Sequence, residues 1–191
     1  IAIILKILKS KKTIYGFDTF SGFPKLSKND IKKNFKNKKY FSSQHLKDSD
    51  FFWYMKKKIN KVNFNTNNIS SSKNFDNSSL EFIKNKIKLL KLDNIEIIKG
   101  DVVKTIPNFF KKNPKKKIMA CNFDLDLYDP YEVALPLVWK NLSKNGYIHL
   151  DEFYSLKFPG PNIATTNFCK KYNLNIKFNN TRKSEFKRCY I

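Results

Sequence analysis

Short apolar runs of strand character recur along the chain and alternate with stretches of helical periodicity. Four such runs are rich in β-branched and aromatic side chains and are bounded by turn or acidic residues. They cover residues 13–18, 94–101, 117–124 and 147–153. Strands that alternate with helices are typical of a parallel sheet covered by helices. The pattern therefore predicts an α/β fold.

The segments between these runs carry apolar residues at helical spacing. Ser78 and Glu81 have the spacing of a capping box, which predicts a helix that ends near Leu92. Residues 130–146 begin with a proline near the first helical position and stop at a glycine, so they predict a second helix. Further elements are expected as helices at 1–8 and 164–171 and as strands at 174–179 and 186–191.

A long polar stretch, residues 25–77, interrupts this order. Such a length inside a compact domain is typical of a lid or a substrate loop. We expect a lid with some helix around 51–59. The chain of 191 residues suits one domain, so we expect a single domain over 1–191 with this lid inserted. Because the chain begins with Ile rather than Met, we also expect further residues upstream.

The formal charge of +22 would ordinarily suggest a nucleic-acid or membrane partner. Only Arg182 and Arg188 are arginines, however, and the lysines are spread along the whole chain. Binding faces for phosphate favour clustered arginine, so we interpret the charge as a compositional bias and expect neither partner. Three cysteines without a paired spacing indicate a reducing, cytoplasmic location. The apolar start is too short for a membrane span.

Acidic residues follow the four strand runs. Asp18, Asp101 and Asp124 each close one run, and Asp151 with Glu152 follow the core of the fourth. Because the carboxyl ends of parallel strands share one edge of the sheet, these acids are expected in one crevice, where an acid commonly holds a ribose. The alternative is that each acid only caps the turn after its strand.

The densest acidic group is the stretch 124–129, which holds Asp124, Asp126 and Asp129. Acids at alternate positions leave a strand on the same side, so Asp124 and Asp126 should converge. The neighbouring strand would bring Asp151 and Glu152 close. Several carboxylates in one crevice repel one another unless a cation offsets them, and hard oxygen ligands suit Mg²⁺ or Ca²⁺. The sequence therefore predicts a divalent metal site.

The stretches YGFDTFSGFP, GDVVKTIP, FDLDLYDPYEVALPLVWKNLSKNGYIHLDEF and FPGPNIAT together resemble the TylF-type macrocin O-methyltransferase family. These are class I enzymes that use S-adenosylmethionine (SAM). The resemblance runs from about residue 13 to the end, outside the lid. It implies a Rossmann-like, mostly parallel sheet with an antiparallel last strand. The sequence contains no Gly-x-Gly, so the family's first strand and its Gly-rich loop are expected to be missing.

The resemblance also implies site residues. The SAM ribose and adenine would lie against Asp18, Thr19, Phe20, Asp101 and Val102. A Mg²⁺ that orients a vicinal pair of sugar hydroxyls would be held by Asp124, Asp151 and Glu152. The implied acceptor is a sugar-like small molecule, and a homo-oligomer is left open.

Methyl transfer to a sugar hydroxyl needs a metal or a base, because the hydroxyl is a weak acid. Asp124 or Asp126 is the expected base, and His45 in the lid is a further candidate. His149, inside a strand, is expected to be structural. Two alternatives remain: a non-catalytic α/β binding module, and a nucleic-acid methyltransferase fragment suggested by the sequence YDPY.

Overall fold

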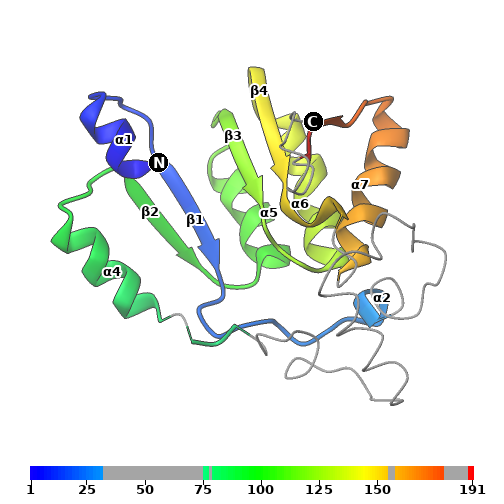
Figure 1. Ribbon diagram of the computed structural model, residues 1–191, viewed down its shortest axis with the longest axis horizontal. Coiled ribbons are helices and arrows are strands. Elements are labelled where there is room, and N and C mark those ends of the chain that lie inside the picture. Colours follow the sequence, from blue (N-terminus) through cyan, green and yellow to red (C-terminus); the bar gives the residue numbers. More distant parts are fainter. Residues whose placement is uncertain (32–74, 78, 155–157, 179–188) are drawn as a thin grey trace, which may run out of the picture.

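The computed structural model describes residues 1–31, 75–77, 79–154, 158–178 and 189–191. Helices and strands alternate along most of this part of the chain (Figure 1). The strands are β1 (Ile14–Asp18), β2 (Ile95–Lys99), β3 (Ile118–Phe123), β4 (Leu142–Leu150), β5 (Lys177–Phe178) and β6 (Cys189–Tyr190). The helices are α1 (Ala2–Ile7), α2 (Lys28–Asp30), α4 (Leu80–Leu89), α5 (Val102–Lys112), α6 (Tyr128–Lys140) and α7 (Pro159–Tyr172), with a 3₁₀ turn at Asp151–Tyr154. The α/β prediction is confirmed.

The strands form two sheets. In one, β1 pairs in parallel with β2, and in the other the order is β3-β4-β6-β5. β3 and β4 are parallel, whereas β6 runs antiparallel to β4, with His149 opposite Tyr190. The expected antiparallel last strand is therefore confirmed.

β1 and β3 point the same way in Figure 1. Within the described ranges, β1 pairs with no strand other than β2, and β3 pairs with no strand other than β4. Helix α5 packs on β1, since the ring of its Phe109 lies 4.8 Å from that of Tyr15 and 5.4 Å from that of Phe17, and it also packs on α6, which covers the β3–β4 sheet. One helix thus joins the two halves of the α/β layer.

The core lies where α6 packs between α5 and α7 and against the β3–β4 sheet. Its centre is fully buried at Tyr131, Leu135 and Ile148. Burying side chains of this size stabilises the fold by about 1.5–3 kcal/mol each. The core thereby fixes β3, β4 and α6, which carry the acidic residues of the 124–152 region.

Helix α5 was missed by the periodicity argument. Asp101 is its N-cap, accepting a hydrogen bond from the backbone N–H of Val103 at 3.0 Å. Ile106, Phe109 and Phe110 bury one face of it. Pro107 inside the helix and the lysines at its end obscured this pattern in the sequence.

Helix α6 ends earlier than predicted. The expectation of a helix over 130–146 is wrong beyond Lys140, because β4 begins at Leu142. There the chain pairs with β3, and the backbone N–H of Ile118 donates to the carbonyl of Asn141 at 2.9 Å. Pairing with a distant strand overrides the local helical pattern.

Two helix boundaries also differ. The N-cap of α4 is Ser79 rather than Ser78, since the Ser79 hydroxyl accepts from the N–H of Phe82 at 3.1 Å. Helix α7 begins at Pro159, five residues before the expected start, with proline in its first turn.

The expected helix at 51–59 and His45 lie outside the described residues. No helix in the described part of the chain is both long and apolar enough to cross a membrane.

Candidate functional site

A cavity of about 630 Å³ lies at the carboxyl ends of the parallel strands. The acids that follow all four strands line it, namely Asp18, Asp101, Asp124, Asp126, Asp151 and Glu152. Apolar side chains form much of the remaining wall, among them Phe17, Phe23, Leu125 and Phe158. The acids expected at one edge of the sheet therefore do share one cavity.

Asp18 and Asp101 also cap local turns. Asp18 Oδ1 accepts a hydrogen bond from the backbone N–H of Phe20 at 2.6 Å, and Asp101 caps α5 through Val103. The capping interpretation is thus correct for both residues. It does not exclude a ligand role, because each carboxylate has a second oxygen and both residues line the cavity.

The turn after β1 has a constrained backbone. Phe20 has a φ of 54°, in the left-handed region that non-glycine residues rarely adopt. The hydroxyl of Thr19 donates to the carbonyl of Gly22 and fixes the turn. Thr19 and Val102 line the cavity, whereas Phe20 belongs to the turn and is not part of the cavity wall.

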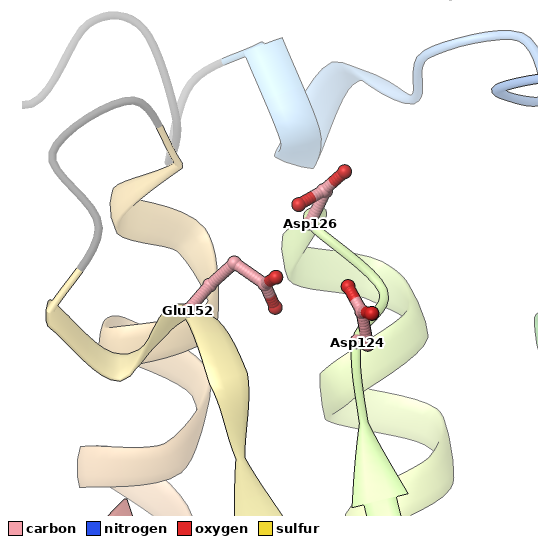
Figure 2. A group of neighbouring side chains, drawn as sticks. All are labelled: Asp124, Asp126 and Glu152. Atoms are coloured by element: carbon pink, nitrogen blue, oxygen red, sulfur yellow. The ribbon is translucent and has the colours of Figure 1, made fainter. Parts of the chain in front are cut away.

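Three carboxylates converge at one point of this cavity. Oxygen atoms of Asp124, Asp126 and Glu152 all lie within 4.8 Å of one another. Figure 2 shows these three side chains as neighbours. Asp151 lines the same cavity but does not belong to this group. The structure therefore brings Asp126 beside Asp124 and Glu152, as the sequence argument expected, whereas Asp151, which the family resemblance implied as a metal ligand, lies outside this group.

Asp126 reaches the group through the loop and not through strand alternation. β3 ends at Phe123, and Asp126 has a φ of 59°. A left-handed non-glycine residue costs roughly 1–2 kcal/mol, so the surrounding contacts must hold it there. Backbone strain at an acid that lines a cavity is typical of a functional position.

Glu152 is the buried member of the group, with 6% of its surface exposed. Burial and, to a smaller extent, the neighbouring charges of Asp126, Asp124 and Asp151 together raise the pKa of Glu152 to about 10. At neutral pH and without a cation, Glu152 therefore carries a proton.

The hydroxyl of Tyr131 supports a protonated Glu152. It lies 2.8 Å from the carbonyl of Phe123 and 2.9 Å from Glu152 Oε2. A hydroxyl has one proton, so it can donate fully to only one of these two oxygens. A protonated Glu152 resolves the conflict, because it donates to the Tyr131 oxygen while Tyr131 donates to Phe123. The sequence argument did not identify this role for Tyr131.

An aromatic wall was also missed. The ring of Phe23 lies 5.3 Å from that of Phe75 and 5.9 Å from that of Phe158, and all three line the cavity. The motifs FSGFP and FPGPN contain two of these residues, but no local periodicity marks them as neighbours. His149, in contrast, pairs with Asn122 at 2.7 Å and is not part of the cavity wall, in agreement with a structural role.

The sheet order, the antiparallel last strand and the cavity at the strand ends define a Rossmann-like α/β fold of the kind that methyltransferases use. A crystal structure of CalS11, a calicheamicin methyltransferase, matches with a TM-score of 0.67 at 20% identity over 100% of this chain and 65% of that chain. The apo structure of CalS11, a TDP-rhamnose 3'-O-methyltransferase, matches with a TM-score of 0.60 at 18% identity over 100% and 64%.

The O-methyltransferase NovP matches with a TM-score of 0.62 at 16% identity, over 99% of this chain and 63% of that chain. The chain thus spans less than two thirds of the length of these structures. No known protein family matches the sequence, and no curated protein sequence matches it either. At these identities the structural likeness establishes the fold.

Proposed function

We propose that this chain forms the core of a SAM-dependent O-methyltransferase that acts, with a divalent metal, on a hydroxyl of a sugar or glycosylated small molecule. The observation that carries the proposal is the group of Asp124, Asp126 and Glu152, whose oxygens lie within 4.8 Å of one another in the strand-end cavity. The names of the structural neighbours, a calicheamicin methyltransferase and an O-methyltransferase, support the reaction class.

The residues present suit the nucleoside part of SAM. Asp18 is the last residue of β1, and its second carboxylate oxygen is available to a ribose hydroxyl, while Thr19, Asp101 and Val102 line the same cavity. SAM supplies an activated methyl group.

The same cavity suits Mg²⁺. Three oxygen donors converge, and the pKa of Glu152 is raised by burial and by the carboxylates around it, so a cation there would offset that repulsion. A bound Mg²⁺ would lower the pKa of an acceptor hydroxyl. Asp124 or Asp126 would take the proton from that hydroxyl. Asp151, beside the group, remains an alternative ligand to Asp126, and His45 remains a candidate base.

The aromatic wall suits the acceptor. Phe23, Phe75 and Phe158 line the same cavity as the acids, and aromatic rings pack well on the apolar face of a sugar. These rings would exclude water around the hydroxyl.

The free cysteines, Cys121, Cys169 and Cys189, agree with the proposed cytoplasmic location.

Two titrations of the 191-residue chain test the proposal. Calorimetry with S-adenosylhomocysteine should show binding that Asp18→Ala weakens about ten-fold or more, the loss expected for a charged hydrogen bond. Mn²⁺ titration followed by electron paramagnetic resonance should show one site that Asp124→Asn removes. Each substitution should leave the other ligand's affinity nearly unchanged.

Failure of the chain to bind S-adenosylhomocysteine would contradict the proposal. Binding without transfer of a tritiated methyl group from SAM to any of a set of nucleotide sugars would favour the non-catalytic module instead. Transfer to DNA or RNA in preference to the sugars would favour the nucleic-acid enzyme.

A further inference from the structure

Helix α6 begins directly after the loop that carries Asp124 and Asp126, and its own N-cap residue cannot cap it. That residue is Leu127, whose apolar side chain makes no capping hydrogen bond. The first backbone N–H groups of a helix need acceptors, and Ser, Thr, Asp or Asn ordinarily provides one at this position. The acceptor for this helix comes from a distant part of the chain.

Asp30 supplies it. Asp30 Oδ1 accepts a hydrogen bond from the backbone N–H of Asp129, in the first turn of α6, at 3.1 Å across 99 positions of sequence. Figure 2 shows α2, drawn in pale blue, next to Asp126 and the start of this helix. A carboxylate at a helix N-terminus also interacts favourably with the helix dipole.

Asp30 is itself held firmly. It is only 3% exposed, and the hydroxyl of Ser27 donates to its Oδ2 at 3.0 Å. The N–H of Asp30 donates back to the Ser27 hydroxyl at 2.9 Å. Asp30 also closes a capping box with Ser27 in the three-residue helix α2. The side chain of Asp129 adds a second acid nearby with one buried oxygen, Oδ1, that has no hydrogen-bond partner. Burying a carboxylate beside another is unfavourable, so the hydrogen bonds to Asp30 must offset that cost.

The cap that Asp30 provides bears on the loop that carries Asp124 and Asp126. Asp126 is in a left-handed conformation that needs support from both sides. On the β3 side, Phe123 is buried and its carbonyl accepts from Tyr131. On the α6 side, the anchor is the hydrogen bond from Asp129 to Asp30.

We propose that Asp30 is a positioning residue, which caps α6 from a distance and thereby fixes the loop that carries Asp124 and Asp126. The effect of Asp30 on metal binding rests on the function proposed above, whereas its effect on the loop is independent of that function. Asp30 acts through the first turn of α6, where it accepts the hydrogen bond from the N–H of Asp129.

The test compares Asp30→Ala, Asp30→Asn and the exposed neighbour variant Asn29→Ala. Asparagine retains an oxygen that accepts from the Asp129 N–H but removes the charge. Mn²⁺ affinity should fall about five- to ten-fold in Asp30→Ala, the equivalent of a lost helix cap, and stay within about two-fold of wild type in the other two variants. S-adenosylhomocysteine affinity should stay unchanged in all three. Equal losses in Asp30→Ala and Asp30→Asn would mean that only charge matters and would overturn the proposal.

Amide hydrogen exchange at Asp129, followed by NMR without metal, keeps the test independent of the proposed function. Exchange should be slow in wild type and Asp30→Asn and at least about ten-fold faster in Asp30→Ala. If wild type binds no Mn²⁺, the metal proposal fails, and this exchange pattern alone decides the role of Asp30. Equal exchange rates in all variants would refute it. If Asp30→Ala does not fold, Ser27→Ala should speed the same exchange by a smaller factor, and no change there would refute the role equally.

Discussion

The proton on Glu152 should make the stability of the metal-free protein depend on pH. Burial and the charges around it raise the pKa of Glu152 from 4.5 to about 10 in the folded chain. Between these values the folded protein holds a proton that the unfolded chain has lost. The contribution of protonated Glu152 to the free energy of unfolding is therefore fully present below about pH 4.5 and declines as the pH rises toward 10.

The variant Glu152→Gln isolates this effect, because glutamine has the shape and the hydrogen-bonding groups of protonated glutamate and does not titrate. One group that differs by a full proton between the two states changes the free energy of unfolding by on the order of 1 kcal/mol per pH unit. From pH 5.5 to 7.5, wild type should therefore lose on the order of 2 kcal/mol relative to Glu152→Gln.

Urea unfolding followed by circular dichroism, in EDTA at both pH values, measures this difference. Asp151→Asn is the matched control, since it removes an exposed carboxylate next to Glu152 and should keep most of the wild-type pH dependence. Added Mg²⁺ should reduce the dependence in wild type, because a cation favours ionised Glu152. Identical pH profiles for wild type and Glu152→Gln would refute the reasoning.

Three further substitutions test the packing around the site by urea unfolding at pH 5.5. Tyr131→Phe removes the hydroxyl between β3 and Glu152 and should cost about 1–3 kcal/mol; a change below about 0.5 kcal/mol would contradict its bridging role. Gly100→Ala should cost at least about 1 kcal/mol, because φ is 139° and the added Cβ would lie 2.8 Å from Thr105 Cγ2; an unchanged midpoint would rule this out. Ile148→Ala, at a fully buried position in β4, should cost about 2–5 kcal/mol, and a smaller loss would mean that the core collapses around the gap.

The sequence by itself determined the strands and the edge at which their acids meet. Strand character is a local pattern, and the carboxyl ends of parallel strands necessarily lie on one side of a sheet. For this reason Asp18, Asp101 and Asp124 could be assigned to one cavity without coordinates. The parallel order and the antiparallel last strand followed from the alternation of elements and from the family resemblance.

Tertiary structure decided how the acids come together and which of them stays apart. Asp126 joins Asp124 and Glu152 as expected, but through a left-handed residue in the loop after β3 and not through strand alternation, and Asp151 lies outside the group. The end of α6 was decided in the same way, since pairing of β4 with β3 overrode the helical pattern at residues 141–146. The contact of Asp30 with Asp129 spans 99 positions, and local periodicity carries no information about such pairs. These contacts form only when packing brings distant segments together, which is why the chemistry at the centre of the site could not be derived from the strand pattern.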